Sequence, residues 1–495
     1  MKKHISILLL LAMMLSAFAG CSDAPAAEET DTTDPTASAE AVETVETEEE
    51  TMYLPDDLPA DLTYDGTTVT TFGWSGPANA EFYVEEMNGE IVNDAIFERN
   101  ATVSERLDVV LEYTLVPGAN PDRASWVNNI SNSITAGDGA YDIAAGYSMA
   151  GASLAAKSML IDLNTLAHID FTKPWWPSSL QNEATVAGKL YFCSGDISTY
   201  MIYYLYGMYF NKQLISDYSL DNPYNLVKEG TWTLDKLMSM SEGIYVDANG
   251  NGTKDLADIY GFETHSTYVD PFYFGSGLRT TTVAEDGLPV LSDDFGSEKT
   301  HDVLVKLVEF FNTNDAWLET SSYDNANNLF KEGRAIFIDH EFTLAINHLR
   351  NTEMDYGIVP IPKYDEAQTE YYTVMSFPYS LYGVPIDAKN PDMSAAVMEC
   401  LASESYRQVS PALFETGFKV KYATDNESAE MFDIIRESVV FDFGRIFNDN
   451  FSSKTYSLFR SAVVNRDTNW ASIYNTNAKA LSKMIAKVVE TLAGE

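Results

Sequence analysis

One short acidic loop, between residues 247 and 258, holds the most regularly spaced set of possible metal ligands. Side chains that carry oxygen recur there at the spacing of an EF-hand calcium loop, and Gly252 occupies the sixth position, where such a loop turns sharply. Because Ca²⁺ prefers several hard oxygen ligands around one point, we predict a structural calcium site. The candidate ligands are Asp247, Asn249, Asn251, Thr253 through its backbone carbonyl, Asp255 and Asp258.

The same loop has a second interpretation, an Asn- and Gly-rich turn that is held by its own hydrogen bonds. Asparagine replaces aspartate at two ligand positions, which lowers the negative charge, and the last ligand is Asp258 rather than the longer glutamate. The sequence leaves both interpretations open.

A second set of candidate residues combines aromatic rings with carboxylates. Aromatic residues make up 12% of the chain, and their faces stack on the C–H patches of sugars, whose hydroxyls pair with carboxylates. Aromatic stripes usually belong to the core, so we choose candidates by their position at predicted strand ends. The candidates are Trp74, Tyr147, Phe272, Tyr273 and Phe342, with Ser148 beside Tyr147 and with Asp196, Asp270 and Glu341 as carboxylate partners.

Motifs for catalysis are missing from the sequence. Gly-x-Ser-x-Gly, His-Glu-x-x-His and a glycine-rich phosphate loop do not occur. A glycosidase needs two carboxylates across a cleft, but carboxylates are so numerous here that pairs carry no information. His340 and Glu341 are adjacent, and neighbours on one strand point to opposite faces. We therefore expect a protein that is not an enzyme.

The net charge of the chain limits the classes of molecule that it can bind. Its 495 residues suffice for two domains, and 74 acidic against 31 basic residues give a net charge of −43. Such a surface repels nucleic acids and anionic membranes, which excludes a nucleic-acid role. It also disfavours an anionic substrate, so a neutral solute fits best. We expect a monomer.

The N-terminus has the pattern of an export signal. Two lysines precede an apolar stretch, 5–19, that is too short to span a bilayer comfortably. It ends in Phe18-Ala19-Gly20-Cys21, which resembles a bacterial lipobox and implies cleavage after residue 20 with lipidation of Cys21. The chain would then be anchored to the outer face of the cytoplasmic membrane. Ordinary signal cleavage with a free cysteine is the alternative.

Residues 21–62 are rich in Ala, Thr, Glu, Asp and Pro and poor in aliphatic side chains, so we predict a disordered acidic tether. The two remaining cysteines, Cys193 and Cys400, are too few for a disulfide framework. Buried thiols are favoured over a bridge between them.

From Thr63 onward, strand and helix patterns alternate. Strands are expected at 69–74, 109–113 and 141–146, and amphipathic helices are expected at 91–107 and 126–134. This alternation predicts an α/β fold with a mostly parallel sheet, whose ligands lie beyond the carboxyl ends of the strands. Later in the chain we expect a helix capped by Thr233, a helix over 303–311, a strand over 335–339 and closing helices over 395–401 and 481–492.

Several short motifs follow one another in a recognisable order. They are Gly188–Tyr191 leading into Gly195-Asp196, Tyr209–Lys212, Gly230–Thr233, the Asn-Gly loop before Tyr260-Gly261-Phe262, and Tyr356–Lys363. This order resembles the extracellular solute-binding lipoproteins of ABC importers, a family that includes many sugar binders. Asp270–Tyr273 is similar to a segment that supplies a stacking aromatic in related sugar binders. Trp175 and Trp176 are expected to pack on a lobe rather than to contact a ligand.

The resemblance implies a two-lobed periplasmic-binding-protein-like α/β fold, with discontinuous lobes joined by a hinge that closes on the ligand. It implies capture of a mono- or oligosaccharide and delivery to ABC permease subunits in the membrane. An anchored glycan-degrading enzyme and a glycan-binding adhesin without transport are the alternatives. The expected parts are 63–195 and 340–384 for the first lobe with the hinge crossing, and 196–339 and 385–495 for the second lobe with the C-terminal helices.

Overall fold

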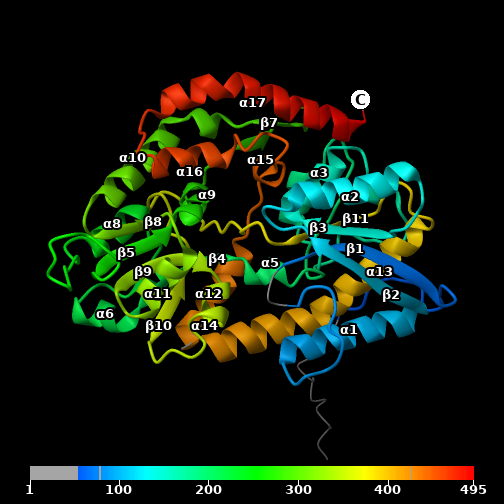
Figure 1. The fold of residues 1–495 in the computed structure, drawn as a ribbon, viewed down its shortest axis with the longest axis horizontal. Helices are drawn as coiled ribbons and strands as arrows, with labels where there is room; N and C mark the ends of the chain where they lie inside the picture. The colour runs from blue at the N-terminus through cyan, green and yellow to red at the C-terminus, as the bar shows by residue number, and fades with distance from the viewer. Residues whose placement is uncertain (1–53, 77–79, 424, 495) are drawn as a thin grey trace, which may run out of the picture. The chain divides into compact units, whose positions relative to one another are not determined.

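Two separate β-sheets organise the chain (Figure 1). In the first sheet the order is β11-β3-β1-β2; β1 is parallel to β2 and β3, and β11 is antiparallel to β3. In the second the order is β10-β4-β9-β5-β8; β5 is parallel to β8 and β9, and β4 is antiparallel to both neighbours. We call the parts around these sheets lobe 1 and lobe 2. The strands are β1 (Thr67–Ser75), β2 (Val109–Pro117), β3 (Ile143–Tyr147), β4 (Tyr206–Asn211), β5 (Tyr260–His265), β8 (Ala316–Glu319), β9 (Ala335–Glu341), β10 (Tyr356–Val359) and β11 (Ser380–Gly383), with a separate hairpin of β6 (Thr281–Val283) and β7 (Pro289–Leu291).

The computed structural model describes residues 54–76, 80–423 and 425–494. The predicted signal peptide, Cys21 and most of the predicted tether lie outside these residues. Within them, no helix is long and apolar enough to cross a membrane.

Helices connect the parallel strands of lobe 1, as the alternating pattern predicts. The predicted apolar face of α1 is confirmed, since Ile96, Val103 and Leu107 are buried. The helix α2 ends at Gly137, whose φ of 66° is easily adopted without a Cβ. Contacts join α1 to α13 and α2 to α3. The lobe 1 helices are α1 (Ile91–Leu107), α2 (Arg123–Ala136), α3 (Ser148–Ala155), η2 (Leu163–Thr165), α4 (Ser178–Ala184), α5 (Tyr200–Tyr203) and α13 (Pro391–Glu404).

Lobe 2 is covered by shorter helices. The predicted cap is confirmed: Thr233 accepts a hydrogen bond at 3.2 Å from the backbone N–H of Lys236 at the start of α8. The predicted core helix is α10, which buries Leu304, Leu307 and Phe311. The lobe 2 helices are α6 (Lys212–Asp217), α7 (Pro223–Lys228), α8 (Leu234–Ser241), η3 (Ser266–Val269), α9 (Asp270–Gly275), η4 (Asp293–Gly296), α10 (Glu298–Asn312), α11 (Tyr323–Lys331), α12 (Thr343–Asn347), α14 (Asn426–Glu437), α15 (Phe443–Ile446), α16 (Tyr456–Val464) and α17 (Trp470–Ala493).

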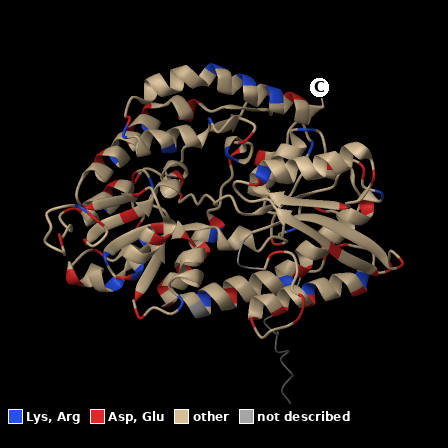
Figure 2. Cartoon of the chain, viewed as in Figure 1, with Lys and Arg blue, Asp and Glu red and all other residues tan. Residues whose placement is uncertain are grey.

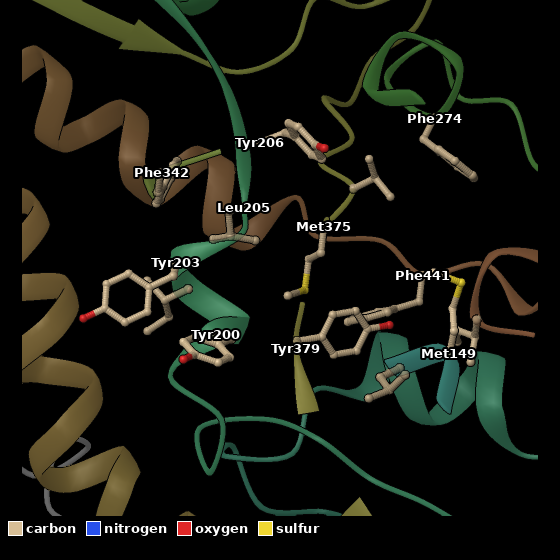
Figure 3. Close-up of a cluster of buried hydrophobic side chains, with 14 of the residues drawn as sticks. Met149, Tyr200, Tyr203, Leu205, Tyr206, Phe274, Phe342, Met375, Tyr379 and Phe441 are labelled. Atoms are coloured by element: carbon tan, nitrogen blue, oxygen red, sulfur yellow. The ribbon is translucent and has the colours of Figure 1, made fainter. Parts of the chain in front are cut away.

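The chain passes between the lobes several times. Leu205, directly before β4, and Met375, on the return toward β11, pair through an antiparallel bridge and lie close together in Figure 3. The predicted crossing over residues 375–384 is therefore confirmed. A third crossing continues α13 through the π-helical segments η5 (Ser405–Val409) and η6 (Pro411–Tyr422), and η6 contacts both α1 and α14. Such π-helical turns are common at functional sites.

Three predicted boundaries are wrong. Order begins before residue 63, because Asp56 is buried and pairs with Arg106 of α1. The strand β10 belongs to lobe 2 rather than lobe 1, since it pairs with β4. The helix α13 belongs to lobe 1 rather than lobe 2, since it packs against α1. The two-lobed α/β fold itself is confirmed.

Buried polar and thiol groups are accommodated within lobe 1. Cys193 and Cys400 are buried and free, which confirms core thiols over a bridge. Trp175 and Trp176 are buried, and their indole N–H groups donate to the carboxylate of Glu399 at 3.2 and 2.8 Å. Both tryptophans therefore have a packing role, as expected, although in the interior rather than on the surface.

Candidate functional site

A cavity of about 470 Å³ lies where the strand ends of both sheets meet the crossing segments. Tyr147 ends β3 of lobe 1, and Glu341 ends β9 of lobe 2. Carboxyl ends of strands are the usual ligand sites of α/β sheets, so the cavity lies where such a fold binds its ligand. The residues that line it are Asn120, Arg123, Tyr147, Met149, Tyr204, Tyr206, Thr267, Tyr268, Tyr323, Glu341, Ser376, Phe377, Pro378, Asn448, Ser453, Tyr456, Ser457 and Arg460.

Aromatic rings form much of the cavity wall, and they brace one another. Tyr206 and Tyr268 meet edge to face with ring centroids 5.5 Å apart, and Tyr268 lies 5.7 Å from Tyr323. On the crossing and C-terminal side, Phe377 and Tyr456 lie 5.2 Å apart. Rings held in this way keep their orientation without a ligand, which favours stacking on a flat apolar ligand face.

Glu341 is the acidic side chain of this wall. It is 8% exposed, and the hydroxyl of Thr343 donates to its Oε2 at 3.1 Å. Burial raises the pKa of Glu341 to about 7. Among the described residues, no Lys, Arg or His forms an ion pair with this carboxyl group, so its oxygens keep acceptor capacity for a ligand.

Two arginines line the cavity, and each is held by a carboxylate. Arg460 Nε lies 2.8 Å from Asp270 Oδ1, and Arg445 Nη1 lies 2.8 Å from Oδ2 of the same group. Arg123 makes a two-point contact with Asp449 at 2.8 and 3.1 Å, and its guanidinium lies 5.6 Å from the ring centre of Tyr147. Bidentate pairing fixes the direction of the remaining guanidinium N–H groups.

The predicted binding residues divide into three groups. Tyr147 and Glu341 line the cavity. Asp270 does not line it but holds Arg460, which does. Asp196 lies at a separate pocket of about 150 Å³, where it accepts hydrogen bonds from Ser410 and from Arg436.

The other residues that the sequence predicted at the cleft are core residues in the structure. Trp74 is 2% exposed; its indole N–H donates to Ser380 at 2.9 Å, and its ring packs edge to face on Tyr147 at 5.3 Å. It is buried because β1 is an inner strand and Tyr200 also covers the ring. Trp74 therefore supports Tyr147 from behind.

Four further residues that were predicted at the cleft are also buried. All residues of α9 are buried; in this helix Phe272 contacts Phe262, and Tyr273 contacts Phe459. Phe342 is fully buried against Phe418 and Phe432, because the chain turns into α12 directly after β9 (Figure 3). Ser148 is buried and donates to the carbonyl of Phe377 at 2.7 Å, which ties the crossing segment to α3.

Sequence reasoning missed most of the cavity wall. Thr267 and Tyr268 directly follow β5, so the criterion of strand ends could have found them. Tyr206 begins an antiparallel strand, where that criterion does not apply. The C-terminal residues Tyr456 and Arg460 lie on α16 and carry no sequence signal that distinguishes them from core residues of a helix.

The predicted calcium loop is closed by its own hydrogen bonds. The carboxylate of Asp247 accepts from the backbone N–H groups of residues 250, 251 and 252. The amides of Asn249 and Asn251 both donate to Asp255. Asp258 is fully buried and accepts from the Tyr245 hydroxyl at 2.9 Å and from backbone N–H groups. The loop therefore has the hydrogen bonds that an Asn-Gly turn is expected to have.

The chemistry of this donor set still suits Ca²⁺. Asp247, Asp255 and the Asn249 and Asn251 side chains supply hard oxygens within one turn of chain. However, no three His, Cys, Asp or Glu side chains gather closely enough to hold a metal anywhere in residues 54–76, 80–423 and 425–494. Occupation by calcium therefore depends on the amide and backbone oxygens turning toward the ion.

The fold can be compared with solved structures. No family model matches the sequence, and no curated protein matches it. The cyclic α-maltosyl-1,6-maltose binding protein of Arthrobacter globiformis superposes with a TM-score of 0.56 at 15% identity, over 85% of this chain and 99% of that one. The GacH receptor of Streptomyces glaucescens, solved with acarbose, gives 0.55 at 16%, over 85% and 99%.

A third similar structure is an ABC substrate-binding protein of Listeria monocytogenes in complex with cycloalternan. Its TM-score is 0.52 at 14% identity, over 85% of this chain and all of that chain, 100%. Nearly the whole length of each of these proteins is matched, so the likeness includes both lobes and their connections. The chain therefore shares the two-lobed α/β fold of the substrate-binding proteins of ABC transporters.

Proposed function

We propose that this protein binds a neutral mono- or oligosaccharide in the cavity between its sheets and delivers it to an ABC permease. The observation that carries the proposal is the lining of the cavity, which combines aromatic rings that contact one another with one carboxyl group and two fixed guanidinium groups. Rings suit the C–H faces of a sugar, and the charged groups suit its hydroxyls.

The structural neighbours support a carbohydrate as the ligand. The GacH receptor was solved with acarbose, and the Listeria protein was solved with cycloalternan. Another neighbour is a cyclo/maltodextrin-binding protein that was solved with maltotetraose. At 13–16% identity the residues of their sites do not transfer to this chain. The chemistry of its own cavity is the independent support.

The charges at the cavity support a neutral ligand. When Glu341 is ionised, the positive and negative side chains at the cavity and directly behind it are equal in number, so a charged ligand would leave one charge buried and unbalanced. Elsewhere Asp and Glu are spread over the helices and loops of both lobes rather than gathered in one patch (Figure 2). The balanced groups are Arg123, Arg445, Arg460, Asp270, Glu341 and Asp449.

The cavity favours binding over hydrolysis. Glycoside hydrolases act with two carboxyl groups that flank the scissile bond. Within the part of the chain that the structure describes, Glu341 is the one carboxylic acid that lines the cavity. Capture by movement of the lobes about the crossing segments at Leu205, Met375 and η6 requires no covalent step.

Calorimetry with a panel of sugars tests the proposal. We expect maltotetraose, maltose or another neutral sugar to bind with a submillimolar Kd, and glucuronate and glucosamine, which carry charge, to bind more weakly than glucose. Glu341→Gln should weaken binding, and Asp196→Asn, at a separate pocket, should not. Absence of binding by every neutral sugar would contradict the proposal. Release of shorter sugars, followed by chromatography, would instead favour the glycan-degrading alternative.

A transport function and an adhesin function differ in whether the protein works with permease subunits at the cytoplasmic membrane. We propose that the chain is anchored outside the cytoplasmic membrane through Cys21 and that it serves permease subunits there. Deletion of the chain should abolish uptake of the sugar it binds, whereas an adhesin would leave uptake unchanged. We also propose that Ca²⁺ binds the 247–258 loop in a structural role, because no residue of that loop lines the cavity.

A further inference from the structure

A short hydrogen-bonded chain runs from the cavity into lobe 2. Tyr268 is one of the residues that line the cavity, and its hydroxyl lies 3.2 Å from His340 Nε2. His340 is 3% exposed, and its Nδ1 lies 3.0 Å from the backbone carbonyl oxygen of Glu341. His340 does not line the cavity itself, and Tyr268 is the side chain that connects its imidazole to the cavity.

The partners of this chain determine where its protons lie. A carbonyl oxygen can only accept, so His340 Nδ1 carries the proton and donates it to Glu341. Burial lowers the pKa of His340 to about 3, so the ring is neutral near pH 7 and Nε2 is an acceptor. The Tyr268 hydroxyl must then donate its proton to Nε2.

The ring of Tyr268 is held as firmly as its hydroxyl. It meets the imidazole of His340 edge to face at 4.7 Å and the ring of Tyr206 at 5.5 Å. Since the only hydroxyl proton points at His340, the Tyr268 oxygen can offer a ligand nothing but its lone pairs.

We propose that His340 is a positioning residue that fixes the Tyr268 hydroxyl as a hydrogen-bond acceptor, so that the cavity selects sugars presenting a hydroxyl donor at that point. This inference rests on the proposed carbohydrate function. It adds a specificity rule for the hydroxyl that faces Tyr268. An ether oxygen or fluorine in place of that hydroxyl cannot donate a hydrogen bond. Such a ligand is rejected, because two acceptors would face each other.

The first experiment needs no sugar. In ¹⁵N-histidine-labelled protein, the side-chain nitrogens of His340 should show the neutral Nδ1–H tautomer from pH 8 to pH 5, with Nε2 shifted by an accepted hydrogen bond. Tyr268→Phe should move that Nε2 resonance by several ppm and leave His301 unchanged. A His340 that carries its proton on Nε2, or that titrates between pH 5 and 8, would overturn the proposal while leaving the carbohydrate function untouched.

The second experiment measures coupling, with maltotetraose as the probe. Tyr268→Phe and His340→Phe should each weaken binding about tenfold, and the double variant should be no weaker than either alone. His340→Gln, which retains an acceptor oxygen, should recover part of the loss. The matched control is Tyr323→Phe, a cavity tyrosine without a bond to His340, whose effect should multiply with that of His340→Phe.

Independent losses that multiply to about a hundredfold in the Tyr268–His340 pair would show that the imidazole does not act through the phenol. Full affinity in a folded His340→Phe variant would equally contradict the positioning role. Failure of the wild-type protein to bind maltotetraose would count against the proposed ligand class, whereas the nitrogen spectra would still decide the tautomer.

Discussion

Tyr147 and Glu341 line the same cavity although they belong to different sheets. Tyr147 is the last residue of β3, and Glu341 is the last residue of β9. Any movement that separates the lobes changes the distance between these two side chains. A ligand that contacts both therefore stabilises the closed arrangement, because it gains both contacts only there.

The first prediction concerns Glu341. Glu341→Gln keeps the shape of the side chain but removes its charge and half of its acceptor capacity, so the Kd of the cognate sugar should rise roughly ten- to a hundredfold. Calorimetry measures this change. The control is Glu353→Gln, an exposed carboxyl group outside the cavity, which should bind normally. Equal affinity in both variants would place the ligand elsewhere.

The second prediction concerns Trp74, which is a core residue rather than a ligand contact. Trp74→Ala removes a fully packed ring and leaves the Ser380 hydroxyl without its donor, so it should cost about 3–5 kcal/mol of unfolding free energy. Chemical denaturation measures this loss. Tyr83→Ala, at a ring that is 41% exposed, should cost far less. A Trp74→Ala variant of normal stability that has lost sugar binding would return this residue to the binding site.

The third prediction is that the protein is more stable near pH 5.5 than near pH 8. Burial raises the pKa of Glu183, Glu341 and Glu399 to about 7 in the folded chain, from an ordinary value of 4.5. Between these values the folded state holds protons that the unfolded state releases. Stability from these groups is therefore present at low pH and is lost as the pH rises through about 7.

A melting series from pH 8 to pH 5 tests this sign. The melting temperature should rise as the pH falls, and Glu399→Gln should flatten part of the slope, because an amide does not titrate while its one oxygen can still accept from the indole N–H of Trp176. Below about pH 4 the trend should reverse, because the pKa of Asp56 is lowered beside Arg106 and its stabilisation is lost there. A melting temperature that falls steadily from pH 8 to pH 5 would contradict the assignment.

The fourth prediction concerns the 247–258 loop. If it binds Ca²⁺, excess calcium should raise the melting temperature relative to chelator, since a ligand of the native state stabilises it by mass action. Asp247→Ala should remove that increase, whereas Asp286→Ala, in another exposed loop, should retain it. Identical melting curves in calcium and in chelator would leave only the hydrogen-bonded turn.

The fifth prediction concerns Cys21, which lies outside the described residues. Cys21→Ala should move the protein from the membrane fraction to the soluble fraction, because attached acyl chains would supply its membrane affinity. Fractionation after a salt wash measures this. A variant that stays with the membranes would exclude the lipid anchor.

The sequence by itself determined the elements that depend on local pattern. The apolar period of α1, the Thr233 cap of α8 and the buried strand at β3 follow from side chains within a few residues of one another. The alternation of strands and helices likewise predicted the α/β class and the strand-end cavity that Tyr147 and Glu341 share.

Only the tertiary structure decided which strand-end residues face the ligand. Trp74 and Tyr147 both end strands of one sheet, yet Tyr200 and Ser380, which come from later segments, cover Trp74 and leave Tyr147 at the cavity. Arg460 reaches the cavity because Asp270, far away in the sequence, holds it there. Burial and ion pairing between distant segments have no local signature, because they arise only when packing brings those segments together.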